Sequence, residues 1–415
     1  MKKVLFWLII VLASIATYKA ARAEDTAEAA APADKPTVEY KGGFIIRTPD
    51  DKFNLKINGA AHLWHFWESV EGGQDTNTFR LRRATFMTTG TFHEKFSVTT
   101  IFQTTTTGGF DYVKEVDAAG VATTEHEDRL LTYWQTTATL TIMPELVIEG
   151  GHVYLPFDRL GETSSGSRLF TELPITATQR DGIKGTTTSS IARNPFGTDE
   201  DIGIRIGGDI SKFNYNIGVV NGTGAHTLNG NNEFNYGLRL MYNILGAVGY
   251  AESDLDWSET PQLAIGTGTI FEDEDAVDAN TGTGLNWAWL ASTDIGFKWR
   301  GLALNTDLYF RKLKTAASLS LDDVGYYIHL GYFVLPKKVE VGARAAQMFR
   351  EGPDNNSNEF GGVVTWFIKG QNLKLQTDYT NVLDYDAIIT FFVIQISELQ
   401  KNIVLKMEHL NKPYH

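Results

Sequence analysis

The chain has 415 residues, of which 12% are aromatic and 39 are glycine, and it carries a formal net charge of −13 at pH 7. It contains no cysteine, which excludes a disulfide framework, a thiolate metal site and a cysteine nucleophile. The acidic balance argues against nucleic acid as a partner, because proteins that bind phosphate backbones are rich in lysine and arginine.

The N-terminus has the pattern of a secretory signal peptide. Two lysines precede an apolar run over residues 4–18, and Ala21-Arg22-Ala23 supplies a small-x-small cleavage motif. We expect residues 1–23 to be a signal peptide and residues 24–41, rich in Ala, Glu, Asp and Pro, to be a flexible periplasmic lead. No later stretch approaches the roughly 20 continuous apolar residues of a membrane-spanning helix, so a membrane-resident chain would have to span as a closed sheet.

A period of two residues dominates the chain from Phe53 to Ile396. Leu304 and Leu308 would share one face of a strand, and Asn305 and its odd-numbered neighbours would share the other. About sixteen such strands predict an all-β fold, a closed transmembrane antiparallel β-barrel with lipid outside and water inside. We assign residues 42–396 to the barrel and residues 397–415 to a C-terminal tail.

The expected strands are separated by connections that alternate in length. In chain order the strands lie near residues 53–67, 78–91, 96–107, 130–142, 146–155, 202–210, 213–220, 234–244, 262–271, 286–299, 302–312, 324–335, 339–349, 359–368, 373–380 and 387–396. Short connections such as 93–95 are typical of periplasmic turns, whereas a seventh turn, after Leu245, has a longer return to Gln262. The connection at 157–201 is too long for an ordinary hairpin, and we expect this third external loop to fold into the barrel and narrow it.

The alternation also assigns side chains to the lumen. Five acids fall on the inward face, namely Glu149, Asp294, Asp307, Glu340 and Asp378. A larger basic set falls there too: Lys56, Arg80, Arg82, Arg205, Arg239, Lys298, Arg311, Arg344 and Lys374. Because charges in a narrow, low-dielectric-walled pore act at short range, this local excess predicts a mild preference for anions.

The constricting loop would add a second basic set, Arg159, Arg168, Arg180, Lys184 and Arg193. Acids are interspersed with them in the same loop, so strong anion selectivity is not assured. For any single arginine, the alternative is an ion pair with an inward acid that holds the shape of the barrel. Arg83 breaks the alternation of its strand, which indicates a β-bulge or an interfacial position.

Several aromatic residues lie near the ends of expected strands, where the lipid interface would be. They are expected to form girdles and comprise Trp64, Trp67, Trp287, Trp289, Trp299, Tyr332, Phe333 and Trp366. A soluble sandwich could also bury such side chains. Their position beside turns favours the girdle.

Two patterns resemble catalytic or metal sites. Ser164, Ser165 and Ser167 lie in the long loop, and His152 and Asp158 flank it, but no G-x-S-x-G elbow accompanies them. We therefore expect that the protein is not an enzyme. The alternative is a hydrolase embedded in the membrane.

Metal binding is also disfavoured, and we expect no cofactor. His62 and His65 are three residues apart, which on a strand places them on opposite faces. The acidic run Glu272-Asp273-Glu274-Asp275 lacks the spacing and central glycine of a calcium loop, so a solvated loop is the better interpretation.

A set of short motifs is shared in order and spacing with a known family. They are Gly42-Gly43-Phe44, Phe53-Asn54-Leu55-Lys56-Ile57-Asn58-Gly59, Phe79-Arg80-Leu81-Arg82-Arg83-Ala84, Tyr154-Leu155-Pro156-Phe157, Tyr242-Asn243-Ile244-Leu245-Gly246 and Ala251-Glu252-Ser253-Asp254-Leu255. With these motifs the chain resembles the phosphate-selective porin O/P family of Gram-negative outer membranes. The resemblance implies a sixteen-stranded, usually homotrimeric barrel with an inward third loop and basic residues that guide anions. The tail after Ile396 departs from the aromatic-terminated last strand of that family.

These observations together predict an outer-membrane porin, a water-filled channel for passive diffusion of small hydrophilic solutes with a mild preference for anions such as phosphate. Its partners would be outer-membrane lipid and lipopolysaccharide, small anions or other hydrophilic solutes, and two further copies of the chain. The alternative is a non-conducting structural or adhesive outer-membrane barrel whose long loop fills the lumen.

Overall fold

The computed structural model describes residues 35–70, 76–104, 111–116, 122–126, 133–177, 196, 200–222, 229, 232–277, 284–315, 320–351, 356–383 and 387–396. The expected signal peptide and the expected C-terminal tail lie outside these described residues. No helix in this part of the chain is long and apolar enough to cross a membrane.

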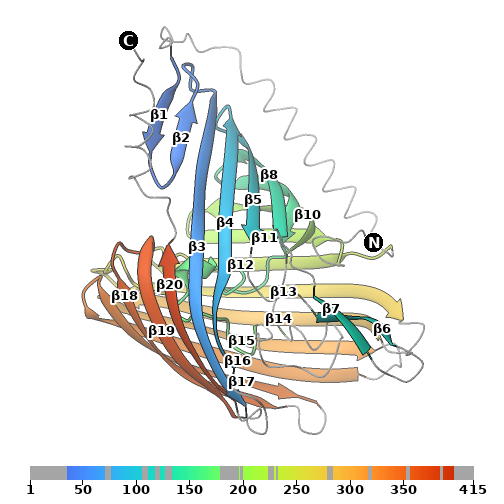
Figure 1. Cartoon of the computed structure of the whole chain (residues 1–415). Coiled ribbons are helices and arrows are strands. Elements are labelled where there is room, and N and C mark those ends of the chain that lie inside the picture. The colour runs from blue at the N-terminus through green and yellow to red at the C-terminus, as the bar shows by residue number, and fades with distance from the viewer. Residues whose placement is uncertain are drawn as a thin grey trace.

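Sixteen of the described strands form one closed antiparallel barrel, which confirms the predicted fold class and strand number. They are β3 (Phe53–Val70), β4 (Thr76–Phe92), β5 (Phe96–Thr104), β8 (Tyr133–Met143), β9 (Leu146–Tyr154), β10 (Glu200–Ile210), β11 (Phe213–Val220), β12 (Asn235–Leu245), β13 (Gln262–Val277), β14 (Gly284–Trp299), β15 (Leu302–Thr315), β16 (Ser320–Leu335), β17 (Val339–Arg350), β18 (Ser357–Phe367), β19 (Leu373–Val382) and β20 (Ala387–Ile396). Each pairs with the next in this order, and β20 closes the cylinder against β3 (Figure 1). β13 continues through the acidic run that we expected in a loop.

Four further strands lie outside this cylinder in the described part of the chain. β1 (Thr37–Tyr40) and β2 (Phe44–Arg47) form a hairpin that adds to β3 beyond the end of β20, and an Arg47–Glu39 ion pair of 2.9 Å joins its strands. β1 therefore occupies the end of the segment that we expected to be a flexible lead. β6 (Asp111–Val116) and β7 (Ala122–His126) form a separate two-stranded sheet within the expected external loop at 108–128.

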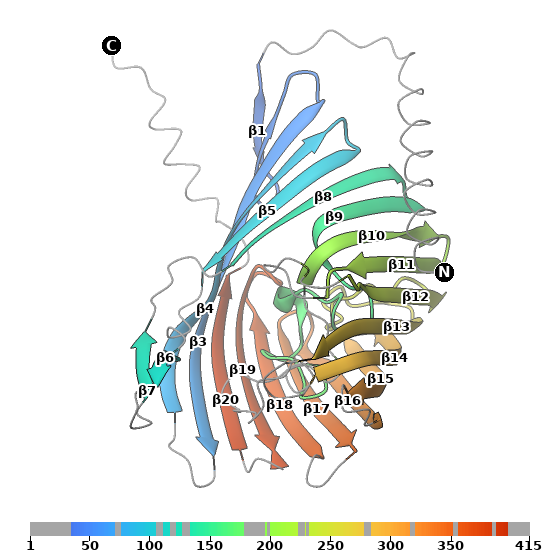
Figure 2. The same ribbon diagram turned by 90° about the vertical axis from the view of Figure 1, so that its right-hand side faces the viewer.

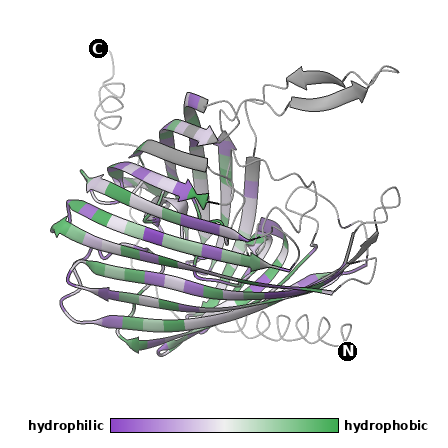
Figure 3. Ribbon diagram, turned by 90° about the horizontal axis from the view of Figure 1, so that it is seen from below, coloured by the Kyte–Doolittle hydropathy of each residue, from purple (hydrophilic) through white to green (hydrophobic). Residues whose placement is uncertain are grey.

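Hydrophobic and hydrophilic residues alternate along many of the strands (Figure 3), and exposed and buried residues alternate in the same way. On β15, Leu308 is 57% exposed, whereas Asn305, Asp307 and Tyr309 are at most 1% exposed. Ile204 on β10 is 43% exposed. The apolar faces therefore point outward, as a barrel in lipid requires, and do not pack on one another as they would in a soluble sandwich.

Four of the eight expected girdle aromatics are exposed on the outer face. Trp289, Trp299, Tyr332 and Trp366 are between 41% and 51% exposed. Trp64 and Phe333 were wrongly placed in the girdle: each is 1% exposed, on the inner face. Trp64 faces inward because it alternates with exposed Leu63, and the guanidinium of Arg82 lies over its ring.

The short connections at one end of the barrel are tight turns. His93 and Glu94 have φ angles of 49° and 58°, and Arg300 and Gly301 have φ angles of 47° and 84°. Two successive residues with positive φ define the turn whose twist matches that of paired strands. We refer to this end as the short-turn end. On β4, the predicted irregularity is a bulge, because the register with β3 shifts between the Arg83 and Leu81 pairs.

We expect Leu308→Arg to lower the free energy of unfolding in lipid by about 2–4 kcal/mol, because it places a charge near the middle of an outward face. Urea titration in liposomes would measure the difference. Leu308→Val is the matched control and should cost less than about 1.5 kcal/mol. Equal stability of the arginine and valine variants would contradict a lipid-facing exterior.

Candidate functional site

The lumen contains the first part of the connection between β9 and β10. Residues 155–177, which we call the long-loop segment, are enclosed by the strands (Figure 2). Phe157, Leu160, Leu169 and Phe170 are at most 2% exposed. Several of these side chains join a buried apolar cluster with inward residues of the wall. The segment is therefore packed against the wall along much of its length.

Inward-facing glycines make room for this segment. A Cβ atom at Gly268 would overlap the carbonyl oxygen of Phe157, and one at Gly218 would lie 2.6 Å from the ring of Pro156. Such distances are too short for non-bonded carbon and oxygen atoms. Glycine at these wall positions allows the closest approach of the enclosed backbone.

A second segment enters the lumen from the short-turn end. Residues 246–261, which we call the turn segment, connect β12 to β13, and Val248, Glu252, Ser253 and Asp254 are at most 3% exposed. The sequence showed only that this connection is longer than the other turns. Its length and its glycines at 246 and 249 were the available signals that it is not a simple turn and could enter the lumen.

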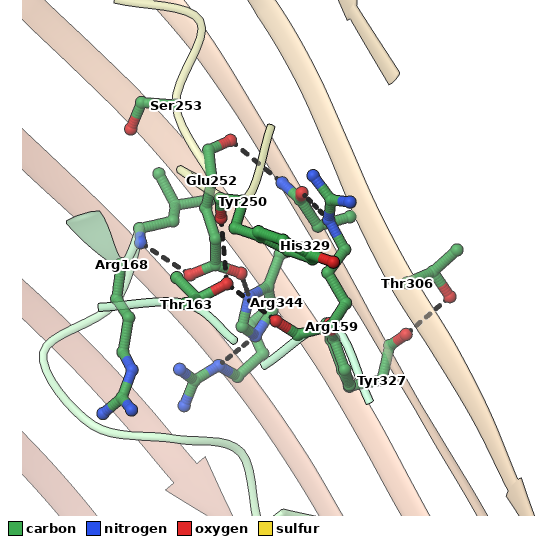
Figure 4. Close-up of polar contacts among 12 residues, drawn as sticks. Arg159, Thr163, Arg168, Tyr250, Glu252, Ser253, Thr306, Tyr327, His329 and Arg344 are labelled. Atoms are coloured by element: carbon green, nitrogen blue, oxygen red, sulfur yellow. Dashed lines mark hydrogen bonds and ion pairs between the residues drawn. The ribbon is translucent and has the colours of Figure 1, made fainter. Parts of the chain in front are cut away.

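The two segments meet inside the barrel, and Glu252 lies at their junction (Figure 4). Its N–H donates to the Ser167 carbonyl at 3.0 Å, and its Oε2 accepts the Leu169 N–H at 2.8 Å. Its Oε1 lies 2.6 Å from His329 Nδ1, and its carbonyl accepts from the Asn305 side chain at 2.9 Å. Glu252 thus joins the long-loop segment to β15 and β16.

The same network extends across His329. Arg344 Nε donates to His329 Nε2 at 2.9 Å, which assigns the ring proton to Nδ1 and the donor role toward Glu252 to that atom. Burial by itself would raise the pKa of Glu252, but His329, the Leu169 N–H and Arg344 outweigh it and bring the pKa down to about 2. The carboxylate is therefore ionised at neutral pH.

Most of the basic residues assigned to the lumen wall hold these segments. Arg239 is fully buried, pairs with Asp294 at 2.7 Å and donates to the Phe157 carbonyl at 3.1 Å. Arg344 pairs with Glu359 at 2.7 Å and stacks on the Phe170 ring. Lys298 likewise donates to the Val248 carbonyl and Lys374 to the Arg168 carbonyl, whereas Arg311 pairs with Asp323 on the neighbouring strand.

The remaining predicted residues are less enclosed or lie elsewhere. Lys56 is half-buried, Arg82 pairs with Glu172 at 3.3 Å, and Arg205 pairs with Glu162 at 2.8 Å. Arg159 is buried against Asn305, whereas Arg168 is partly exposed and its guanidinium points away from Glu252 (Figure 4). Outside what the structure describes are the Arg80 side chain and the whole of Arg180, Lys184 and Arg193.

The long-loop segment divides the lumen unequally. Glu162 is bound to Arg205 on β10, and the Gly166 carbonyl accepts from Gln395 on β20 at 3.1 Å. The chain between these contacts therefore crosses the barrel. The nine strands β11 to β19 lie on one side of it, and the five strands β3, β4, β5, β8 and β9 lie on the other.

The two sides differ in accessibility. On the nine-strand side the inward residues are largely buried, for example Arg239, Asp307 and Tyr327 at 0% exposed. On the five-strand side, which we call the open side, inward residues near the short-turn end are partly exposed. Because Lys56 faces inward, the residues paired with it across successive strands also face inward. These include Thr89, Thr99 and Thr137, and Thr139 lies two residues further along the same face. Solvent therefore reaches the wall on this side.

The residues that resembled catalytic or metal sites are not assembled into one. Within the described chain, no hydrogen bond joins the hydroxyls of Ser164, Ser165 and Ser167 to a histidine or carboxylate, and no group of three or more potential ligands could hold a metal ion. Asp158 instead accepts from Gly161 N–H and from the Tyr309 hydroxyl, and burial raises the pKa of its carboxyl group despite these bonds.

Comparison with known proteins gives a likeness of fold. No family model matches the chain, and no curated protein matches it. The anion-selective porin of Comamonas acidovorans is similar in structure, with a TM-score of 0.53, 10% identity, and coverage of 83% of this chain and 99% of that one. A loop-deletion mutant of OmpT, an outer membrane protein of Vibrio cholerae, gives a TM-score of 0.49 with 10% identity, covering 82% and 99% of the two chains.

The class defined by the fold is the porin-type barrel, since the Comamonas protein and this chain share its architecture over nearly the whole of the former. The resemblance to the phosphate-selective porin O/P family stays a prediction.

We expect Glu252→Ala to lower the free energy of unfolding by about 2–4 kcal/mol, because it leaves the buried Leu169 N–H and His329 without their acceptor. Denaturant titration in detergent would measure it. Glu259→Ala, an exposed position of the same turn segment, is the control and should stay within about 0.5 kcal/mol of the parent. Similar losses in both variants would contradict the junction role of Glu252.

The lowered pKa of Glu252 also sets a pH window. With a folded pKa of about 2 and an ordinary value of 4.5, the stabilisation by the carboxylate is fully present above pH 4.5 and is lost as the pH falls toward 2. The stability difference between the parent and Glu252→Gln should therefore stay constant from pH 7 to pH 5 and shrink below pH 4.5. A difference that already shrinks between pH 7 and pH 5 would show that the pKa is not lowered.

Proposed function

We propose that the chain is an outer-membrane porin that admits small hydrophilic solutes by passive diffusion. The observation that carries this proposal is the partial exposure of the inner wall on the open side, at the level where the long-loop segment crosses the lumen. A wetted wall beside an inward loop is what a diffusion channel needs. The apolar exterior supports residence in a lipid bilayer.

The finer part of the proposal is a mild preference for anions such as phosphate. The charges near the open side are few: Lys56, Arg82, Arg168 and Arg205 against the partly exposed Glu149 and Glu162 and the buried Glu172. The basic side chains outnumber the acidic ones by a small margin, and ion pairs screen part of that margin. A weak field of this kind biases ions without binding them tightly.

Outer-membrane lipid, lipopolysaccharide and two further copies of the chain complete the proposal as partners. Among the proposed lumen residues, those buried in ion pairs would shape the channel. The residues that would contact ions are Arg80, Arg82, Arg168, Arg180, Lys184 and Arg193.

We expect a reversal potential that indicates anion preference when the purified protein is placed in a planar bilayer under a potassium chloride gradient. The double variant Arg80→Ala with Arg82→Ala should shift this potential toward zero, because it removes two positive charges, one of which pairs with Glu172. The mutation Lys312→Ala, in an exposed pair with Asp322, is the control and should leave the potential unchanged. A clear cation preference of the parent protein would reject the proposed selectivity.

A second candidate function is a non-conducting structural barrel. It is favoured by one observation, the meeting of two segments inside the lumen from opposite ends of the barrel. Single-channel recording separates the two functions. Stable current steps support the porin, whereas a folded barrel without current supports the structural role.

A further inference from the structure

We propose that the main permeants are small uncharged solutes rich in hydroxyl groups, such as sugar alcohols and monosaccharides, and that they pass along a hydroxyl-lined path on the open side. This inference rests on the proposed porin function and names its substrate class. It follows from which side chains reach the accessible part of the lumen and which do not.

The wall of the open side is rich in hydroxyl groups. The register of β3, β4, β5 and β8 places a set of partly exposed hydroxyl residues on the inner face of the wall. They are Thr85, Thr89, Thr91, Ser97, Thr99, Thr137 and Thr139. The glutamines at 103 and 135 extend it. Charged residues among the described inward positions here are Lys56 and Glu149, which have opposite sign, together with Arg82, which pairs with Glu172, and Arg83, which lies opposite His62.

The long-loop segment faces this wall with similar chemistry. Between Glu162 and Gln395 it presents Ser164, which is exposed, and Ser165 and Ser167, which are partly exposed. The contacts that fix this stretch use the backbone carbonyls of Gly166 and Ser167, so they leave the hydroxyl groups available. The long-loop segment and the wall of the open side thus both carry partly exposed hydroxyl groups.

The charged residues that could have made the path ionic are mostly committed elsewhere. Arg239, Arg311 and Arg344 are at most 5% exposed and pair with Asp294, Asp323 and Glu359. An ion that enters a narrow passage loses water and needs fixed charge to replace it. On the open side most fixed charges lie in opposite-sign pairs, such as Arg82 with Glu172 and Arg205 with Glu162, so an ion gains less there than a neutral solute does.

Hydroxyl side chains suit a hydroxyl-rich solute for a specific reason. Each threonine or serine hydroxyl both donates and accepts, so it can replace water for a solute hydroxyl in either role. Many weak, equivalent sites allow a solute to enter and to leave, which a diffusion path requires. The alternative to a role in permeation is that threonine is present only because it favours strands.

The test uses three open-chain solutes of matched size: sorbitol, gluconate and N-methylglucamine. Influx of each into proteoliposomes would be measured under equal gradients, with chloride conductance recorded on the same preparation. We expect sorbitol to enter at least about three times faster than either charged solute, since one or two hydrogen bonds of ordinary strength change a rate by that factor. Sorbitol influx no faster than that of the charged solutes would overturn the inference while chloride current still supported the porin.

A matched pair of triple variants tests the path itself. Thr89→Val, Thr99→Val and Thr139→Val change the inner face, and the first two remove both partners of one 3.0 Å hydroxyl contact. Thr88→Val, Thr100→Val and Thr136→Val change the outer face of the same strands and likewise remove one hydroxyl pair. The inner variant should lower sorbitol influx by about threefold or more with chloride conductance within about a factor of two, and the outer variant should change neither. Equal effects of the two variants would overturn the inference.

Should the inner triple variant fail to fold, the loop side provides an independent readout. Ser164→Ala, Ser165→Ala and Ser167→Ala leave every described backbone contact of the segment in place and should also slow sorbitol by about threefold. Unchanged sorbitol influx in this variant would overturn the hydroxyl path. A parent protein that passes neither ions nor sorbitol would overturn the proposed function, and this inference with it.

Discussion

The hydrogen bonds between β20 and β3 close the sheet, and the rest of the structure depends on that closure. In hydrocarbon an unpaired backbone N–H or C=O costs several kcal/mol, so a sheet can stay there only if it has no free edge. The register from Ala387 opposite Val70 to Ile396 opposite Ala61 removes that edge. Closure then forces the period of two in the sequence to become a division between outside and inside.

A closed wall of sixteen strands encloses more space than its own inward side chains can fill. This chain fills part of that space with two segments from opposite ends of the barrel and leaves the open side accessible. The enclosed backbone brings polar groups into a buried setting, and inward side chains satisfy many of them. Asp378 accepts from Thr171 N–H at 2.8 Å, and Glu359 accepts from Ile175 N–H at 2.8 Å. The lumen is therefore partly a protein core and partly a wetted wall.

The barrel could be predicted from sequence because alternation is a local signal that repeats in every strand. The inward direction of Asn305 and the outward direction of Leu308 follow from spacing alone. The girdle prediction failed for Trp64 and Phe333 because it relied on proximity to a strand end, which does not decide which face a residue takes. The turn segment was missed as a lumen element because a segment's entry into the lumen depends on contacts such as Glu252 with His329, 77 residues apart in sequence.

The buried ion pair of Arg239 and Asp294 has a consequence for how such a chain can change over evolutionary time. A single substitution at either position leaves an isolated charge away from water, which is far more costly than the loss of both. Related chains that have replaced one residue of this pair should therefore have replaced the other as well. Two apolar residues of similar volume could take the place of the ion pair. Covariation of this pair across a lineage would record that the interior around Phe157 has stayed dry.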